Sequence, residues 1–350
     1  MEIAEIYSLY SSCTCLCTDT RKISEGCLFV ALTGETFDGN TFALDALARG
    51  AKYALVSEEI GSDPRLIKVE DTLKTLQALA IYHREVTLKD LPIIGLTGTN
   101  GKTTTKELIR AVLAAKYNVR ATVGNLNNAI GLPVTILSFT PDLDVAVVEL
   151  GASHPGDIDE LTPLAQPNFG LITNVGRAHL LGFGSFEGVQ KTKGELYDYL
   201  KAHGGKVFYN EDDETLCKMV ARRGLTLTHP YSTAYTIYPE AALAFDFKGR
   251  KVQTRLIGRY NLPNVIAAIT LGEYFGVPVE DCIAAVEAYE PTLGRSEYKK
   301  TANNEIIADA YNANPSSMAA ALDNFDAIET SASQVVFIGE MLAIGASSLT

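Results

Sequence analysis

The segment LPIIGLTGTNGKTTTKELIRAVL, residues 91–113, constrains the fold of this chain more than any other stretch. It begins with an apolar run around Ile94, which predicts a buried strand, and it ends with Leu108 and Val112 at helical spacing. The glycine-rich turn 98–104 joins the two. A strand, a glycine-rich turn and a helix N-terminus together form an anion site, because backbone N–H groups and the positive end of the helix dipole face the ligand.

The turn is predicted to bind the phosphates of a nucleotide. The Lys102 side chain would add a point charge at the outer phosphates, and the Thr103 hydroxyl would ligate Mg²⁺. The strict P-loop pattern has a glycine five residues before Gly101, where this chain has Leu96, so the turn is a variant of that pattern. The residues expected at the phosphates are Gly98, Thr99, Asn100, Gly101, Lys102, Thr103 and Thr104.

Composition indicates a globular protein. A chain of 350 residues has room for two or three domains, and 47% apolar with 21% charged residues is ordinary for a soluble protein. The net charge of −12 argues against a generic binder of nucleic acids or anionic membranes. Because neither a signal peptide nor an apolar run long enough to cross a membrane is apparent, a cytoplasmic location is expected.

The chain has six cysteines, and three of them form a C-x-C-x-C run at residues 13–17. No histidine or second cysteine pair follows this run at the spacing of a zinc site. Reduced, partly buried thiols are therefore favoured over metal binding.

The order of the predicted elements indicates an α/β fold with three domains. A small N-terminal α/β domain is expected over residues 1–90, with strands at 27–32, 53–57 and 66–70, helices at 41–51 and 71–86, and a polar loop at 33–40. The second helix has Asp71 or Thr72 as its N-cap.

Strands and helices alternate over residues 91–290, which predicts a doubly wound, mostly parallel sheet. The expected strands lie at 118–123, 144–150, 168–175, 206–210 and 225–229, and the helices at 102–116, 186–203, 211–223, 261–275 and 279–289. Residues 231–258 predict a small antiparallel appendage. Residues 291–350 predict an incomplete C-terminal domain with strands at 305–310 and 334–339 and a helix at 315–325 that starts with proline.

Polar side chains near the ends of the predicted strands are candidates for chemistry. Glu149 ends one strand and His179 follows the next, and the carboxyl ends of parallel strands share the edge where Lys102 lies. A solvated glutamate and a structural histidine are the alternatives. Lys191 and Lys193 lie near the start of a helix, where the dipole disfavours cations, so they are either two surface lysines or a functional or modified pair.

Three asparagines and one arginine are further candidates. Asn210 follows a strand, and Asn261 with Asn264 starts a helix. Amide side chains at these places either recognise a nucleotide base or cap the helices, and the sequence leaves both possibilities open. Arg295 lies where the third domain begins and would suit a phosphate contact.

Several long motifs resemble those of the Mur ligase family. They are GTNGKTTT at 98–105, TDTRKISEGCLFVALTGETFDGNTF at 18–42, GNLNNAIGLP at 124–133, VELGASHPGDI at 148–158, TNVGRAHLLGFGS at 173–185 and YNANPSSM at 311–318. The resemblance extends over essentially the whole chain. It implies the three-domain Mur ligase architecture, with an N-terminal UDP-sugar-binding domain, a central ATP-binding domain and a C-terminal Rossmann-like domain.

The resemblance also implies roles for single residues. The catalytic residues would be Lys102, Glu149, His179 and Lys193. Two Mg²⁺ ions would be held by Thr103, Glu149, His179 and Lys193. Lys193 matches the carbamoylated lysine of the family, and Lys191 is the alternative for that lysine. Asn210, Asn261, Asn264 and Arg295 would join the loop in binding ATP. The substrate would contact Thr18, Asp19, Thr20, Arg21, Asn125, Asn127, Asn128, Asp309, Tyr311, Asn312 and Asn314.

The implied activity is ATP-dependent addition of D-alanyl-D-alanine to UDP-N-acetylmuramoyl-tripeptide through an acyl phosphate, in peptidoglycan synthesis. We expect a monomer that binds neither nucleic acid nor membrane. The alternatives are another ligase of this superfamily, adding diaminopimelate, lysine or glutamate, and a non-catalytic nucleotide-binding module. The YNANPSSM run argues against the amino-acid-adding members, and the N-terminal UDP-type domain argues against a folate ligase.

Overall fold

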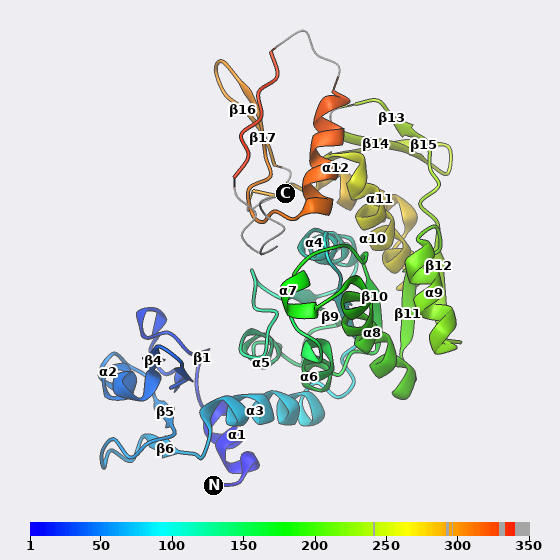
Figure 1. Cartoon of the computed structure of the whole chain (residues 1–350). Coiled ribbons are helices and arrows are strands. Elements are labelled where there is room, and N and C mark those ends of the chain that lie inside the picture. Colours follow the sequence, from blue (N-terminus) through cyan, green and yellow to red (C-terminus); the bar gives the residue numbers. More distant parts are fainter. Residues whose placement is uncertain (241, 292–293, 296, 329–332, 340–350) are drawn as a thin grey trace. The chain divides into compact units, whose positions relative to one another are not determined.

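The computed structural model describes residues 1–350 except 241, 292–293, 296, 329–332 and 340–350 (Figure 1). The described chain divides into two compact units, each treated by itself below. Unit 1 consists of Met1–Leu91, Thr122–Leu143 and Glu160–Gln166, and unit 2 of Pro92–Ala121, Asp144–Asp159 and Pro167–Thr350. The predicted division into domains 1–90, 91–290 and 291–350 remains a prediction, and its last residues lie outside the described part.

Unit 1 is built on a parallel sheet with the strand order β1-β2-β5-β6. Its strands are β1 (Leu16–Cys17), β2 (Leu28–Val30), β5 (Tyr53–Val56) and β6 (Leu66–Lys68), and its helices are α1 (Ile3–Ser11), α2 (Ala43–Ala48), α3 (Thr72–Val86) and α5 (Gly131–Leu137). The predicted strands and helices are confirmed, and Asp71 caps α3 by accepting the Lys74 N–H. The 33–40 loop contains a short hairpin of β3 (Thr33–Gly34) and β4 (Phe37–Asp38), and 3-10 turns cover Thr20–Lys22 and Gly39–Phe42.

Unit 2 contains a six-stranded sheet with the order β12-β11-β10-β7-β9-β8, in which every neighbouring pair is parallel. The strands are β7 (Ile93–Thr97), β8 (Val119–Ala121), β9 (Val145–Glu149), β10 (Phe169–Ile172), β11 (Lys206–Asn210) and β12 (Thr228–Tyr231). The predicted doubly wound parallel sheet is therefore confirmed. Its strand order reverses around the central β7, and open sheets of this kind bind ligands beyond the carboxyl ends of such strands.

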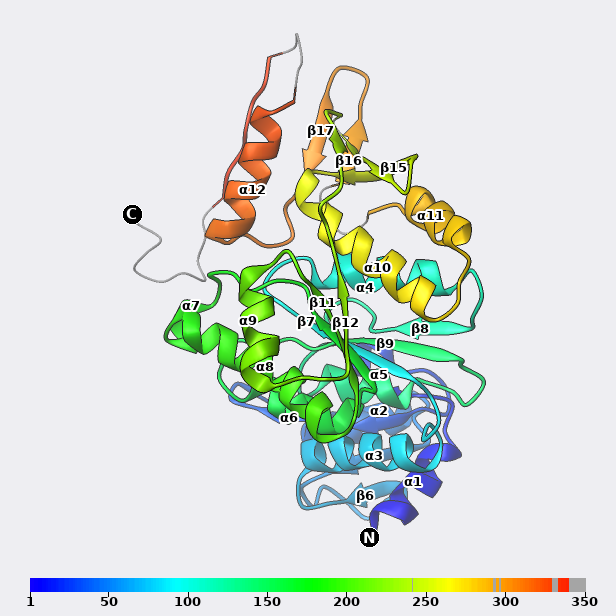
Figure 2. The same cartoon turned by 90° about the vertical axis from the view of Figure 1, so that its right-hand side faces the viewer.

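Helices cover both faces of this sheet (Figure 2). The helices of unit 2 are α4 (Lys102–Leu113), α7 (Leu180–Phe183), α8 (Phe186–Ala202), α9 (Glu214–Arg223), the 3-10 turn η3 (Arg259–Asn261), α10 (Leu262–Tyr274) and α11 (Val279–Ala288). The helix α6 (Asp157–Ala165) begins in unit 2, and its residues from Glu160 onward belong to unit 1. Ile94 and Leu96 of β7 pack into the core shared with α4, α10 and α11. Gly95 faces the other way, where a Cβ atom would meet the Leu196 side chain of α8 at 3.5 Å. A strand buried on both faces explains why the β7 sequence is apolar without alternation.

The C-terminal part of unit 2 differs in places from the prediction. The appendage is an antiparallel sheet of β13 (Ile237–Tyr238), β14 (Ala242–Phe247) and β15 (Arg250–Ile257), as expected. β16 (Glu297–Lys300) pairs antiparallel with β17 (Glu305–Ala308), and α12 (Pro315–Asp326) starts with proline as predicted. The strand expected at 334–339 is wrong: these residues have no regular structure, and Phe337 is 95% exposed. An apolar strand needs a hydrogen-bonding neighbour, and the described residues supply none there.

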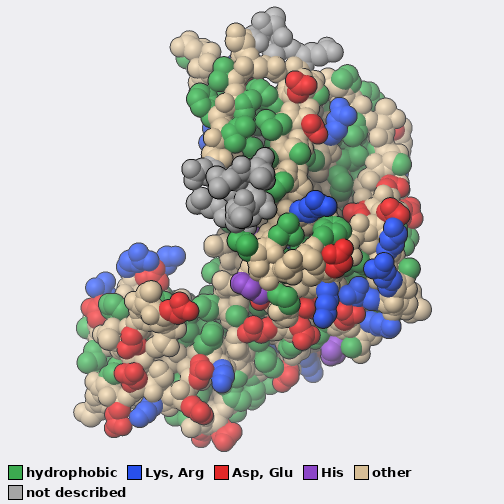
Figure 3. All heavy atoms as spheres, viewed as in Figure 1, with side chains coloured by type: hydrophobic (Ala, Val, Ile, Leu, Met, Phe, Trp, Pro, Cys, Tyr) green, Lys and Arg blue, Asp and Glu red, His purple; other side chains and the backbone are tan. Residues whose placement is uncertain are grey.

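The surface charge is mixed (Figure 3), and the described helices are short or polar. On the face drawn in Figure 3, acidic and basic side chains lie beside one another over both units. No helix in the described part of the chain is long and apolar enough to cross a membrane.

Shortening a core side chain of α4 is expected to destabilise unit 2. Leu108 is fully buried, so Leu108→Ala is expected to lower the free energy of unfolding by about 2–5 kcal/mol. Leu227 is 50% exposed, and Leu227→Ala should change it by less than about 0.5 kcal/mol. Differential scanning calorimetry of both variants measures the difference. Equal losses in the two variants would contradict the placement of α4 in the core.

Candidate active site

The loop between β7 and α4 depends on two glycines. Gly98 has φ +151° and Gly101 has φ +78°, both in the region that favours glycine. A Cβ atom on Gly98 would lie 1.9 Å from Thr173 Oγ1, and one on Gly101 would lie 2.6 Å from Asn264 Oδ1. The side chains of Thr173 and Asn264 therefore lie too close to the loop backbone for any residue other than glycine at positions 98 and 101. Gly101 precedes the first turn of α4, which has no side-chain cap, so the helix leaves its N-terminal N–H groups for an anion.

Lys102 lies over its own loop. Its ammonium donates to the Gly98 carbonyl at 2.9 Å and to the Thr99 carbonyl at 3.1 Å. Burial lowers the pKa of Lys102, the Glu149 carboxylate opposes this shift, and the Arg295 guanidinium adds to it. The electrostatic effect of Arg295 shows that the start of the predicted third domain lies within reach of the loop cation.

The chain that follows β10 holds the other side of the loop. The Asn100 N–H donates to Asn174 Oδ1 at 3.0 Å, and the Asn100 carbonyl accepts from Thr173 Oγ1 at 2.6 Å and Asn174 Nδ2 at 3.0 Å. Sequence reasoning missed a role for Thr173 and Asn174. The available signal was their position, because both residues follow the strand that pairs with β7.

A buried carboxylate and a hydroxyl meet beside the loop. Glu149, at the end of β9, accepts a hydrogen bond from Thr103 Oγ1 at 2.8 Å, and the two residues are 2% and 6% exposed. Among the described residues, no group of three or more His, Cys, Asp or Glu is arranged to hold a metal ion. Mg²⁺ usually takes one or two carboxylates together with substrate phosphates and water, so one carboxylate and one hydroxyl fit a single ion.

Two further ionisable side chains come from the segment between β10 and the end of α8. Lys193 on α8 is 2% exposed, and burial followed by the charge of Lys102 lowers its pKa to about 7, although Asp157, Glu195 and Glu149 oppose the shift. His179 adopts φ +52° at the start of α7, and burial, Lys102 and Lys193 lower its pKa. The structure therefore brings Lys102, His179 and Lys193 within electrostatic reach of one another. His179 and Lys191 are exposed, whereas Lys193 is buried.

The predicted base-contacting amides are engaged in hydrogen bonds within unit 2. Asn264 Oδ1 accepts from Thr105 Oγ1 at 3.0 Å, and its Nδ2 donates to Asn261 Oδ1 at 2.9 Å. Asn261 Nδ2 in turn donates to the Ile257 carbonyl at 2.8 Å. These buried bonds join the start of α4 to the start of α10, so both amides support the loop. Asn210 caps its own turn by accepting the Asp212 N–H at 3.0 Å. The adenine contacts of all three remain predictions.

Residues from the C-terminal part of unit 2 reach the same loop. Asn314, the N-cap of α12, donates through Nδ2 to Asn100 Oδ1 at 2.7 Å, and the Arg295 guanidinium stacks 3.5 Å from the ring centre of Tyr311. Asp309 and Asn312 are exposed. Of this predicted set, Asn314 contacts the loop directly and Arg295 acts on Lys102 through its charge.

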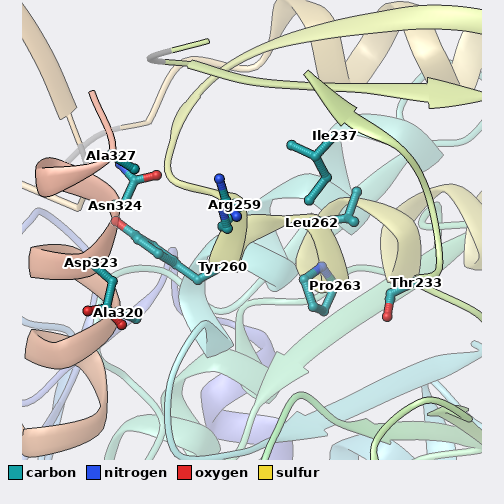
Figure 4. A pocket seen from close by; sticks show the side chains of 10 residues that line it. All are labelled: Thr233, Ile237, Arg259, Tyr260, Leu262, Pro263, Ala320, Asp323, Asn324 and Ala327. Carbon is teal, nitrogen blue, oxygen red and sulfur yellow. The ribbon is translucent and has the colours of Figure 1, made fainter. Parts of the chain in front are cut away.

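A cavity of about 490 Å³ lies between η3, the start of α10, the chain around β13, and α12 (Figure 4). Its lining residues are Thr233, Ile237, Arg259, Tyr260, Leu262, Pro263, Ala320, Asp323, Asn324 and Ala327. Figure 4 shows the Tyr260 ring extending toward Asn324 of α12. This size is within the usual range of ligand pockets. Sequence reasoning missed these residues, although Tyr260 directly precedes the predicted base-contacting Asn261.

The predicted residues for the UDP-sugar and for the substrate loop lie in unit 1. Asp19 caps a 3-10 turn and forms a bidentate ion pair with Arg21, which lowers the pKa of Asp19 to about 2. Asn128 Oδ1 caps α5 by accepting the Gly131 N–H at 2.8 Å. Thr18, Thr20, Asn125 and Asn127 belong to the same compact unit.

Comparisons with known proteins identify the family of this chain. Residues 96–272 match the Mur ligase middle domain, and residues 12–84 match the catalytic domain of the Mur ligase family. The UDP-N-acetylmuramoyl-tripeptide–D-alanyl-D-alanine ligase of Bacillus subtilis is 37% identical over 94% of this chain and 73% of its own.

Two solved structures are also similar. A crystal structure of MurF from Acinetobacter baumannii has a TM-score of 0.87 at 29% identity, covering 99% of this chain and 80% of its own. The structure of MurF ligase from Thermotoga maritima in complex with ADP has a TM-score of 0.77 at 28% identity, covering 89% and 74%. With matches in sequence and in structure over nearly its whole length, this chain belongs to the Mur ligase family.

Proposed function

We propose that this chain is the ATP-dependent ligase that joins D-alanyl-D-alanine to UDP-N-acetylmuramoyl-tripeptide in peptidoglycan synthesis. The observation that carries the proposal is the 37% identity to the Bacillus subtilis ligase of that name across 94% of this chain. ATP and a nucleotide-linked sugar are cytoplasmic compounds, so we propose that the reaction takes place in the cytoplasm.

The reaction proceeds in two steps. The carboxylate of the tripeptide attacks the γ-phosphorus of ATP, which releases ADP and leaves an acyl phosphate. The amine of D-alanyl-D-alanine then attacks the acyl carbon, loses a proton and expels phosphate. Negative charge accumulates on the transferred phosphoryl group, so positioned positive charge is the main catalytic resource. Lys102, the N-terminus of α4 and Arg295 supply that charge from this chain.

Mg²⁺ accompanies ATP, and Thr103 with Glu149 would hold it. When bound, the ion neutralises charge on the β- and γ-phosphates. The buried Thr103–Glu149 pair fits this role, because it offers one carboxylate and one hydroxyl at the edge of the phosphate loop. A second ion near His179 requires another anionic oxygen. Carbamoylation of Lys193 provides one: its neutral amine adds to CO₂ and loses a proton, which gives a carbamate anion.

We also propose that the cavity beside Tyr260 takes the adenine base. It offers an aromatic ring for stacking, and Asp323 and Asn324 lie on its opposite wall as polar partners. Asn261 follows Tyr260 in η3 and connects this cavity to the loop through Asn264.

An assay of ADP release tests the function. It is run with UDP-N-acetylmuramoyl-tripeptide and D-alanyl-D-alanine, together and separately, on this chain and on a version extended to the length of its relatives. Release that requires both substrates supports the proposal. Release with diaminopimelate, lysine or glutamate in place of the dipeptide would assign another ligase of the superfamily, and ATP binding without release would indicate a non-catalytic module.

Removal of the phosphate or metal contacts is expected to stop the chemistry without unfolding the chain. Lys102→Ala and Glu149→Ala should each lower ADP release by at least about 100-fold. Lys218 and Glu214 form an exposed pair on α9, and Lys218→Ala and Glu214→Ala serve as matched controls with near-parent rates. Circular dichroism checks folding. Near-normal turnover in either test variant would refute the phosphate and metal assignment.

Lys193 has a separate test through chemical rescue. Lys193→Ala should lose at least about 100-fold in rate, and a short carboxylic acid should restore part of it by replacing the carbamate oxygens. The exposed neighbour Lys191 provides the control, since Lys191→Ala should keep the parent rate with or without the acid. Full activity of Lys193→Ala without acid would exclude a carbamate at this residue.

The lowered pKa of Lys193 also predicts a pH effect on stability. The folded-state pKa is about 7, whereas the ordinary value is 10.5, so between these values the unfolded chain binds more protons and the free energy of unfolding rises with pH. In CO₂-free buffer this gain should be on the order of 3 kcal/mol from pH 7 to about pH 9.5. Lys193→Met should lose this rise and Lys191→Met should keep it, as measured by calorimetry. Parallel pH profiles for Lys193→Met and the parent would contradict the burial of this cation.

A further inference from the structure

A buried histidine at the end of α3 joins three segments of unit 1. His83 is 5% exposed, and its Nε2 lies 2.9 Å from the Phe139 carbonyl while its Nδ1 lies 2.7 Å from the Tyr7 hydroxyl. That hydroxyl is also 2.6 Å from Thr87 Oγ1. A carbonyl only accepts, so Nε2 carries the proton and donates it to Phe139. Nδ1 then accepts from Tyr7, and Tyr7 accepts from Thr87.

The neutral form of His83 agrees with its surroundings. Burial lowers the pKa of His83, although the hydrogen bond to the Phe139 carbonyl acts in the opposite direction. The rings of Tyr7 and Tyr10 pack around the imidazole, with centres 5.7 Å and 6.2 Å away. Packing and directed hydrogen bonds together fix both the ring orientation and the tautomer.

Two more side chains hold the same segment. The Tyr10 hydroxyl donates to the Leu137 carbonyl, and Gln77 Nε2 donates to the Ala129 carbonyl at 3.2 Å. The α5 helix has only seven residues, so it depends on tertiary contacts. Carbonyls at the end of a helix lack partners within it, and Tyr10 supplies one for Leu137. Tyr7, Tyr10, Gln77 and His83 are named the α5 clasp below.

The clasp holds a segment that the sequence places elsewhere. Residues 122–143 lie between β8 and β9 along the chain, and both of those strands belong to the sheet of unit 2. By its contacts, however, the segment belongs to unit 1. It carries Asn125, Asn127 and Asn128, and Asn128 caps the helix that the clasp holds. The predicted UDP-sugar residues 18–21 lie in the same unit.

We propose that His83 and Tyr7 are positioning residues that fix the 124–133 loop relative to the UDP-sugar residues of unit 1. This inference rests on the proposed function, in which both sets contact one substrate. A rigid connection between the two sets lets them bind the sugar and the peptide of one substrate at the same time. A displaced loop would weaken binding of the UDP-linked substrate and leave the ATP loop, in unit 2, unchanged.

Two substitutions at His83 separate its two hydrogen bonds. In His83→Gln the side-chain amide reaches the position of Nε2 and keeps a donor for the Phe139 carbonyl. In His83→Asn the shorter amide takes the position of Nδ1, keeps the Tyr7 contact and leaves Phe139 without its donor. Tyr7→Phe removes one hydroxyl from the clasp and serves as a milder variant. Lys74→Gln, an exposed change in the first turn of α3, is the control.

The first measurement is amide hydrogen exchange of residues 131–139, which does not depend on activity. His83→Asn should speed exchange there by about tenfold, the factor expected when a buried acceptor loses its donor, and Tyr7→Phe should speed it to a smaller extent. Exchange in β2 and β5 should stay the same in all variants. Unchanged exchange at 131–139 in both His83→Asn and Tyr7→Phe would overturn the clasp.

The second measurement is steady-state kinetics of ADP release. His83→Asn should raise KM for UDP-N-acetylmuramoyl-tripeptide by about tenfold, with kcat and KM for ATP within about twofold of the parent. His83→Gln and Lys74→Gln should stay close to the parent. Two results for His83→Asn would overturn the positioning role. One is faster exchange with an unchanged KM for the UDP-linked substrate, and the other is a fall in kcat together with an equal rise in both KM values. A parent chain that releases no ADP would refute the proposed function instead, and hydrogen exchange would still decide the clasp.

Discussion

Asn100 makes the hydrogen bonds that hold the phosphate loop of unit 2 in place. Its backbone pairs with Thr173 and Asn174 after β10, and its side-chain oxygen accepts from Asn314 at the start of α12. One loop residue thus ties the phosphate loop to the neighbouring strand and to the C-terminal part of the unit. Each of these bonds is directional and partly buried, so the loop has one conformation that satisfies them together. The same packing brings Thr173 against Gly98, whereas the close neighbour of Gly101 is Asn264.

The second organising feature is a group of ionisable side chains at the carboxyl edge of the sheet, of which Lys193 and Glu149 are buried. The positive charge of Lys102 lowers the pKa of Lys193 and of His179, and the Glu149 carboxylate acts in the opposite direction on Lys102 and Lys193. Such an arrangement does not favour folding, since burial alone disfavours each charged form. Its value lies in chemistry, because an anionic phosphate chain with its metal ion would meet charge that is already in position. The lowered pKa of Lys193 further leaves a neutral amine available near pH 7.

The division of the chain into two units would separate the binding tasks of the proposed function. The phosphate loop and the ionisable side chains beside it belong to unit 2, whereas the predicted sugar contacts and the 124–133 loop belong to unit 1. The hydrogen bonds of His83, Tyr10 and Gln77 explain why residues 122–143 follow unit 1 although their sequence neighbours are strands of the other sheet. In the proposed function, the substrate surface of unit 1 would therefore combine parts of the chain that are far apart in the sequence.

Local patterns in the sequence determined most of the architecture. The apolar β7 run, the glycine turn and the spacing of Leu108 and Val112 were sufficient for the strand, loop and helix, because each depends on residues close together in the chain. The strand expected at 334–339 shows the limit of such patterns, since apolar composition does not supply a pairing partner.

Only the tertiary structure decided how distant residues combine. Asn264 contacts Thr105 across 159 positions, and His83 contacts Phe139 across 56. The assignment of α5 to unit 1 and the shifted pKa of Lys193 likewise depend on burial and on neighbours from other elements. The sequence by itself did not predict α1, α5 or α6, but it determined most of the sheet strands, the long helices and the residue types at the site. Their contacts, their protonation and the unit that carries them came from packing between segments far apart in the chain.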